Sequence, residues 1–279
     1  MQQASKVRPA CLLVSSLAFK KMKEISEHCS DLSKLISGYE PEIDWPNQFE
    51  WLNIASGIKK VEFDLIRFDT CFGYCNDADQ WHGAREELLE TYVTELTRFS
   101  YVWGALESLI DDIKPPPAPE RGKINAICYY LKDKLETIDI IPPYFEVLNE
   151  LKLILNSSDV AEPNILNRFQ TSSNISEHGV GLYVIYKLRN RFAHGAISFP
   201  QPDEENKPKS NYPQMILLAT RIVLISMQMI WVAFYKNSTL KISPHYDWEY
   251  DEDEELTVNL ILRNIHLVTP NYKQQMLTI

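Results

Sequence analysis

The feature that most constrains the fold is a seam of apolar residues between Leu89 and Ile113. The seam is Leu89, Tyr92, Leu96, Phe99, Trp103, Leu106, Ile110 and Ile113, at alternating steps of three and four. This spacing predicts one helix of roughly eight turns, which begins near Arg85 and ends before the prolines at 115–119. Gly is scarce, at 9 of 279 residues. A barrel or propeller with many tight turns would need more, so a helical chain is favoured.

The same reasoning places further helices along the chain. We expect one helix over about 123–135, and another that starts at Pro142 and Pro143 and reaches about Leu155. Asn174 is a candidate N-cap of the next helix, with Glu177 as its reciprocal partner. Gly195 suits the left-handed end of that helix. Residues 20–36 could form a helix, and residues 58–68 partly alternate, so they suit either a strand or the start of a helix.

Residues 215–235 are apolar over a length that could cross a bilayer. Arg221 and Gln228 lie seven residues apart on one face of this segment, where a lone membrane span would bury them at high cost. A buried core helix is the favoured interpretation, with a membrane span as the alternative. The apolar residues 10–19 are followed by Lys20 and Lys21 without a small-residue cleavage site, which argues against a secretory signal.

The C-terminal region differs in charge and in pattern. The chain has a formal net charge of -10, and seven of its acidic residues lie between Asp247 and Glu255. This charge argues against a broad nucleic-acid-binding surface, although not against a small cationic site. Apolar residues from Leu256 to Val268 recur at even spacing and predict a short β element. We expect this tail either to pack on the helical body or to cross to a second copy of the chain.

The cysteines provide little functional information. There are five, without the spacing of a disulfide framework, so a reduced, cytoplasmic setting is the simpler expectation. Cys71, Cys75 and His82 have no fourth ligand at a useful spacing. We therefore predict no metal site and no cofactor.

The segment with the clearest chemistry is Tyr186–Gly195, YKLRNRFAHG. On a helix, Asn190 and His194 share a face, and Lys187 and Arg191 form a second pair four residues apart. Arg189 has a long side chain that could swing toward His194. One short helix therefore presents an imidazole, an amide and several cations.

RNA cleavage without a metal ion needs little more than these groups. A base takes the proton of the 2′-hydroxyl, an acid protonates the leaving 5′-oxygen, and a cation stabilises the phosphoryl oxygens. Because the unperturbed pKa of histidine is about 6.5, His194 suits proton transfer. Arg189 matches phosphate geometry, and Asn190 can orient the imidazole or the phosphate.

The arrangement Arg189-Asn190-x3-His194 before Gly195 resembles the signature of HEPN domains (higher eukaryotes and prokaryotes nucleotide-binding). The resemblance implies an all-helical domain, metal-independent endoribonuclease activity, and a homodimer that brings two motifs into one cleft. It also implies a role in antiviral defence or as a toxin. By the same resemblance, Arg189 and His194 are catalytic, with Asn190 in support.

The match extends in context over about residues 85–236. HEPN nucleases often carry an acidic residue on an earlier helix that faces the motif. Glu107 is the candidate for that role here, with Asp111 one turn later. We expect Lys187 and Arg191 to bind RNA.

The sequence thus predicts a mainly α protein. An N-terminal elaboration (1–80) precedes a HEPN-like helical bundle (81–240) and an acidic segment with a C-terminal tail (241–279). The leading function is a cytoplasmic, metal-independent endoribonuclease with RNA as its partner, no membrane association, and a neutralising or sensor protein as a further partner. The acidic segment could mask the cationic cleft or be a solvated tail. The alternatives are a non-catalytic module that binds a nucleotide or a protein, and a structural helical adaptor in which the motif is accidental.

Overall fold

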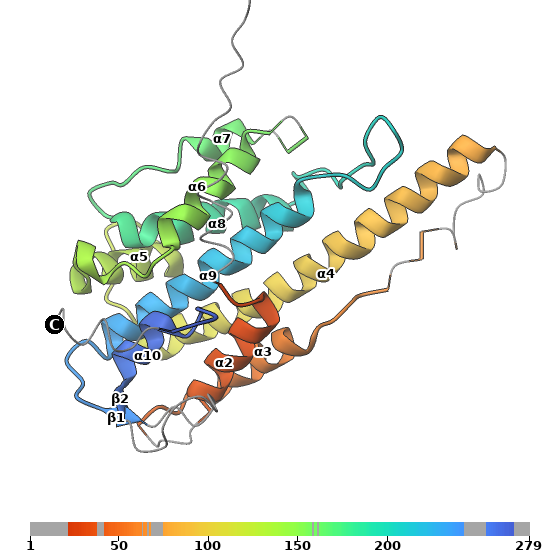
Figure 1. Ribbon diagram of the computed structural model, residues 1–279. Helices are drawn as coiled ribbons and strands as arrows, with labels where there is room; N and C mark the ends of the chain where they lie inside the picture. The colour runs from red at the N-terminus through yellow and green to blue at the C-terminus, as the bar shows by residue number, and fades with distance from the viewer. Residues whose placement is uncertain are drawn as a thin grey trace, which may run out of the picture.

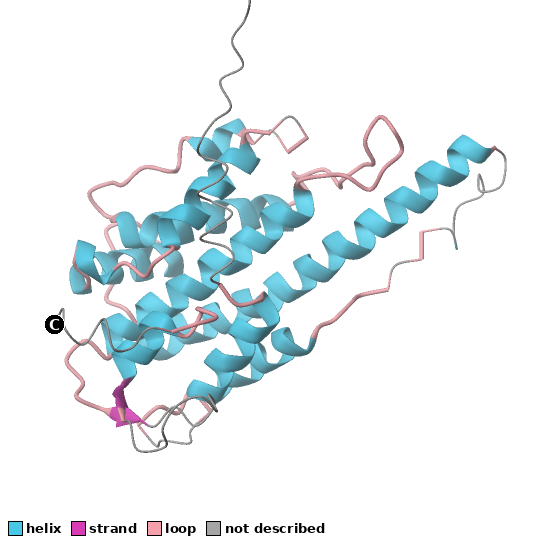
Figure 2. Cartoon of the chain, in the orientation of Figure 1, coloured by secondary structure: helices cyan, strands magenta, loops and turns pink. Residues whose placement is uncertain are grey.

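The computed structural model describes residues 22–37, 42–62, 64–65, 67, 75–157, 159–160, 162–242 and 255–270. Within these ranges the protein is mainly helical, with one two-stranded sheet (Figures 1 and 2). The α-helices are α2 (Ile25–Leu35), α3 (Pro46–Gly57), α4 (Asn76–Ile113), α5 (Lys123–Lys134), α6 (Tyr144–Leu155), α7 (Pro163–Leu166), α8 (Glu177–Ala193), α9 (Tyr212–Phe234) and α10 (Val258–Asn264). A 3-10 turn spans Thr137–Asp139, and the strands are β1 (Lys241–Ile242) and β2 (Leu256–Thr257).

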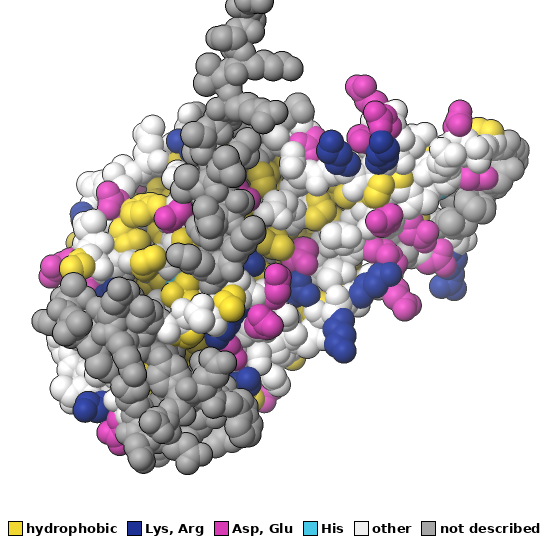
Figure 3. Space-filling model, in the orientation of Figure 1, with side chains coloured by type: hydrophobic (Ala, Val, Ile, Leu, Met, Phe, Trp, Pro, Cys, Tyr) yellow, Lys and Arg dark blue, Asp and Glu magenta, His cyan; other side chains and the backbone are white. Residues whose placement is uncertain are grey.

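The mainly helical fold predicted from the apolar seam is confirmed. The seam lies on α4, which begins earlier than predicted, at Asn76, and ends where Lys114 takes a left-handed conformation before Pro115. Helices α5 and α6 match their predicted ranges closely. The N-terminal end of α4 projects beyond the other helices (Figure 1), and acidic and basic side chains gather over it (Figure 3).

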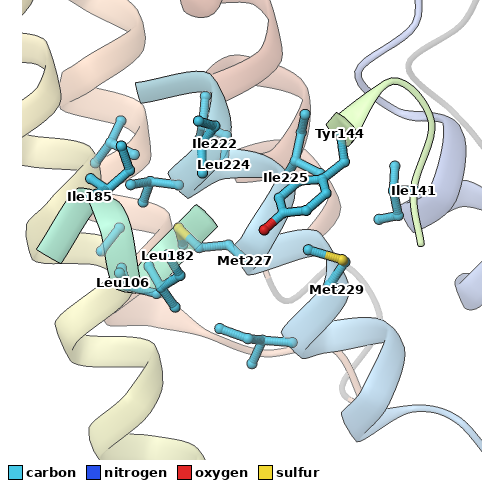
Figure 4. Close-up of a cluster of buried hydrophobic side chains, with 14 of the residues drawn as sticks. Leu106, Ile141, Tyr144, Leu182, Ile185, Ile222, Leu224, Ile225, Met227 and Met229 are labelled. Carbon is cyan, nitrogen blue, oxygen red and sulfur yellow. The ribbon is translucent and has the colours of Figure 1, made fainter. Parts of the chain in front are cut away.

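Helix α9 lies at the centre of the bundle. It packs against α4, α6, α8 and α10, and most of its residues are buried (Figure 1). In the close-up of Figure 4, its side chains meet Leu106 of α4, Leu182 and Ile185 of α8, and Tyr144 at the start of α6. It is the one helix in the described ranges that is long and apolar enough to cross a membrane, and 94% of its most apolar window is buried. The core-helix interpretation therefore fits the burial of α9, as in a soluble protein.

The predicted short β element near residues 256–268 is present, but it is confined to the first two residues of that range. Only Leu256 and Thr257 are extended, paired antiparallel with Ile242 and Lys241, and α10 follows at once. The side chain of Thr257 accepts a hydrogen bond from the backbone of Leu260 at 3.4 Å and so caps α10. Apolar residues on several faces of α10 are buried because the helix packs against α9, and this burial hides the helical period.

Two smaller predictions also need correction. Ser176, not Asn174, is the N-cap of α8. Ser172 instead accepts the backbone N–H groups of Asn174 and Ile175, so this segment forms its own turn. Residues 58–62 form neither a strand nor a helix: they run beside α4, where Val61 donates its N–H to Thr94 at 2.9 Å.

The described parts of both elaborations pack on the bundle. Helices α2 and α3 pack against each other, α3 packs on α4, and α10 packs on α9. Their apolar side chains belong to the same buried core as those of the bundle. The acidic run lies outside the described residues except for Glu255.

Three fully buried polar side chains form a cluster between the elements. They are His28 of α2, Gln228 of α9 and His266, which follows α10. We call them the central histidine cluster. Nε2 of His28 donates to the Gln228 carbonyl oxygen at 2.9 Å, and the Gln228 amide donates to Nδ1 of His266 at 3.2 Å. Nε2 of His266 donates to the carbonyl of Pro142, and the Gln228 amide also donates to the carbonyl of Leu262. The amide therefore fixes one tautomer on each imidazole.

Two glycines position α8. Gly181 allows close approach to Tyr144, because an added Cβ would lie 2.5 Å from the tyrosine hydroxyl oxygen. That hydroxyl accepts the Gly181 N–H at 2.8 Å and donates to the carbonyl of His178 at 3.2 Å. At the other end, Gly195 adopts a φ of 64°, as predicted, and the chain turns away from the helix after His194.

Candidate functional site

An open pocket lies at the C-terminal end of α8 and has a volume of about 310 Å³. We call it the α8-end pocket. It brings together four residues predicted from the motif, namely Lys187, Asn190, Arg191 and His194. The other lining residues are Asn164, Ile165, Arg168 and Ala196.

The backbone at the end of α8 explains why His194 is accessible. His194 is the C-cap of the helix, and it is exposed. The N–H of Gly195 bonds to the carbonyl of Phe192 at 3.0 Å, and the N–H of Ala196 bonds to the carbonyl of Arg191 at 2.9 Å. This pair of bonds is a Schellman motif, which ends the helix and leaves the imidazole at its rim.

Arg191 is held in an ion pair rather than left free. Its Nε lies 3.0 Å from one carboxylate oxygen of Glu162, and an Nη2–H donates to the other oxygen at 3.1 Å. The Glu162 side chain is only 8% exposed, so its charge requires this partner. Nη2 of Arg191 also donates to the carbonyl of Ala196 at 3.3 Å. Glu162 and Arg191 therefore brace the turn that carries His194.

Two other cations in the pocket have no such neutralising partner. Among the described side chains, neither Arg168 nor Lys187 forms an ion pair with a carboxylate. The ammonium of Lys187 lies 5.0 Å from the ring centroids of Tyr183 and Tyr186, and these cation–π contacts orient it without removing its charge. The α8-end pocket is therefore locally positive in a chain whose net charge is -10.

Arg189 and Glu107 each contact Trp103 of α4. The Arg189 guanidinium carbon lies 5.9 Å from the ring centroid of Trp103 on α4. The indole N–H of Trp103 donates to the Glu107 carboxylate at 2.7 Å. Arg189 does not line the α8-end pocket.

Helical geometry accounts for this separation. Successive residues are rotated by about 100°, so Asn190 and His194 are about 40° apart around the helix, whereas Arg189 and His194 are about 140° apart. Arg189 consequently faces α4, and His194 faces the segment that contains α7. Glu107 and Arg189 share Trp103 as a neighbour, and these two described residues form no ion pair with each other.

Sequence patterns did not identify Asn164, Arg168 or Glu162 as part of the pocket. Asn164 lies in the four-residue helix α7 and the other two flank it, in a stretch without apolar periodicity. Pro163 at the first position of α7 is the one local signal of a helix there.

Among the described residues, no three His, Cys, Asp or Glu side chains are placed to hold a metal ion. The pocket instead offers an accessible imidazole, an amide and two uncompensated cations. These groups can bind a phosphate and transfer a proton beside it.

No family model, curated protein or solved structure matches this chain. The resemblance to HEPN domains therefore depends on the motif residues themselves and on their setting in a helical bundle.

Proposed function

We propose that the protein is a metal-independent endoribonuclease of the HEPN type, with His194 as the acid/base group and Arg189 as the stabiliser of the phosphoryl oxygens. The observation that carries this proposal is the accessible His194 at the end of α8, in one cationic pocket with Asn190 and Lys187. Such a pocket can accept a phosphodiester of a polyanionic chain and supply a proton donor and acceptor next to it.

In the proposed reaction the 2′-hydroxyl oxygen forms a bond to the adjacent phosphorus, and the bond from phosphorus to the 5′-oxygen breaks. One proton passes from the 2′-hydroxyl to a base, and another passes from an acid to the leaving 5′-oxygen. The products carry 2′,3′-cyclic phosphate and 5′-hydroxyl ends, and the reaction needs neither a metal ion nor a redox partner.

The position of Arg189 supports a dimeric site. Because Arg189 and His194 point to different sides of α8, a phosphate beside His194 is poorly placed for Arg189 of the same helix. Two copies whose α8 ends face one cleft would present the imidazole of one chain and the guanidinium of the other to a single phosphate. We propose a homodimer of this kind.

The proposed setting is antiviral defence or toxicity in the cytoplasm, with a neutralising or sensor protein as a further partner. RNA cleavage that is not directed to a single substrate would harm the cell that makes the enzyme. Expression should therefore slow growth, and His194→Ala should relieve this effect.

The direct test is incubation of the purified full chain with bulk RNA in EDTA. We expect cleavage that survives chelation and that falls by at least about 10²-fold in His194→Ala and in Arg189→Ala, because each removes a group that acts in the transition state. Arg121→Ala is the matched control, because it removes an exposed cation that does not line the α8-end pocket. It should cleave RNA as the parent protein does. Cleavage that both motif variants retain would contradict the proposal.

A second function, a non-catalytic module that binds a nucleotide or a protein, is favoured by one observation. The Arg189 guanidinium is engaged with the Trp103 ring rather than directed into the pocket. Nucleotide binding that depends on Arg189, in a protein that cleaves no RNA, would support this module.

A further inference from the structure

The sequence predicts that Lys187 and Arg191 both bind RNA, but the ion pairs of the pocket favour a different residue as the second RNA-binding cation. The buried carboxylate of Glu162 takes two contacts from the Arg191 guanidinium. Release of Arg191 to a phosphate would leave that carboxylate buried without a partner, at a large cost in free energy. Arg191 is consequently a structural cation.

Arg168 has the opposite properties. It is exposed, it follows α7, and it lines the same pocket without an ion pair to a described carboxylate. Its backbone N–H bonds to the carbonyl of Ile165 at 2.8 Å, which fixes the turn while the side chain stays available. Arg168 and Lys187 therefore bring to the pocket, from two different elements, two positive charges that no described carboxylate neutralises.

The lining also indicates what the pocket recognises. No Phe, Tyr or Trp is among the described residues that line it, and its one aromatic ring is the imidazole of His194, so it lacks the broad platform on which bases usually stack. Its volume of about 310 Å³ is at the lower end of ligand pockets, which suits a sugar–phosphate unit rather than a stacked pair of bases. Two cations with an amide on an apolar floor match a backbone phosphate.

We propose that Arg168 and Lys187 form a phosphate subsite that holds the backbone of single-stranded RNA beside the cleaved phosphodiester without reading the base. This inference rests on the proposed function for the identity of the ligand, and it adds Arg168 to the site in place of Arg191. Base selectivity, where the protein has any, comes from outside this pocket.

The test measures RNA binding separately from cleavage. The full chain carrying His194→Ala is titrated into fluorescein-labelled homopolymers of uridylate, adenylate and cytidylate at several KCl concentrations, and anisotropy gives the affinity. Adding Arg168→Ala should weaken binding by about tenfold for all three homopolymers. It should also reduce the slope of log affinity against log salt by about 0.7, the value for loss of one single-strand phosphate contact.

Arg168→Lys, which keeps the charge, should retain the slope, and Arg121→Ala should change neither quantity. Equal affinity and slope in the Arg168→Ala and Arg121→Ala proteins would overturn the subsite. A loss confined to one homopolymer would also overturn it, because the pocket would then read a base. So would binding of AMP that depends on Arg168 in a protein that binds no RNA.

The outcomes separate this inference from the proposed function. RNA binding that depends on Arg168, in a chain that cleaves nothing when His194 is intact, would support the subsite and contradict the nuclease. RNA cleavage that depends on His194, together with RNA binding that Arg168→Ala does not change, would support the nuclease and contradict the subsite.

Discussion

Histidine and carboxamide side chains are neighbours in two regions of this molecule, the central histidine cluster and the α8-end pocket. In the cluster, Gln228 lies between His28 and His266, and all three side chains are buried. In the pocket, Asn190 and His194 lie one turn apart on α8, and His194 is exposed. The same chemical groups therefore occur in two opposite environments.

The environments decide what each histidine can do. Burial lowers the pKa of His28 well below its usual value, with help from His266 and the Arg221 guanidinium. Burial, with Lys23 and Arg221 nearby, lowers the pKa of His266 to about 4. These imidazoles are neutral at physiological pH and act as hydrogen-bonding parts of the core, whereas the His194 side chain is exposed and accessible to a ligand.

The two regions should differ most in how much a substitution in each lowers the stability of the protein. Gln228→Leu keeps the apolar volume but leaves the His28 N–H and the Leu262 carbonyl without their partner. We expect the free energy of unfolding, measured in urea, to fall by about 3 kcal/mol. The matched change Asn190→Leu in the open pocket should alter it by no more than about 0.5 kcal/mol. Equal effects of the two substitutions would show that the regions do not differ as described.

A smaller effect is expected from pH. A histidine whose pKa is about 6.5 in the unfolded chain and about 4 in the folded chain binds fewer protons when folded. Its contribution to stability is complete above pH 6.5 and is lost as the pH falls toward 4. For His266 alone, the free energy of unfolding should fall by about 2 kcal/mol between neutral pH and pH 5.

Unfolding in urea across this pH range checks the prediction. His266→Asn should reduce the pH dependence by about that amount. A pH dependence that is the same in the parent and in His266→Asn would contradict the assignment of a buried neutral imidazole.

The two regions also differ in how far the sequence predicted them. The α8-end pocket was partly predictable, because Lys187, Asn190, Arg191 and His194 lie within eight residues of one helix. The central cluster was not, because 200 residues separate His28 from Gln228 and only tertiary packing brings them together. Glu162 and Arg168 were missed for a similar reason, since their short helix has no periodic pattern.

The fold shows the same limit. Long helices with one apolar face, such as α4, were predicted from their spacing alone. The β element near residues 256–268 was expected to extend further than it does, because burial on several sides of α10 produced an even spacing of apolar residues. Thr257 was the available signal, as a capping residue immediately before the helix.

The central claim is that the accessible histidine of the α8-end pocket takes part in attack by a ribose 2′-hydroxyl. The most direct measurement uses a DNA oligonucleotide that contains a single ribonucleotide, incubated with the full chain in EDTA. We expect one cut, immediately 3′ of the ribose, with a 2′,3′-cyclic phosphate end and no cut in the His194→Ala protein. An intact oligonucleotide under conditions in which bulk RNA is cleaved, a cut at a deoxyribose position, or cleavage by the His194→Ala protein would contradict it.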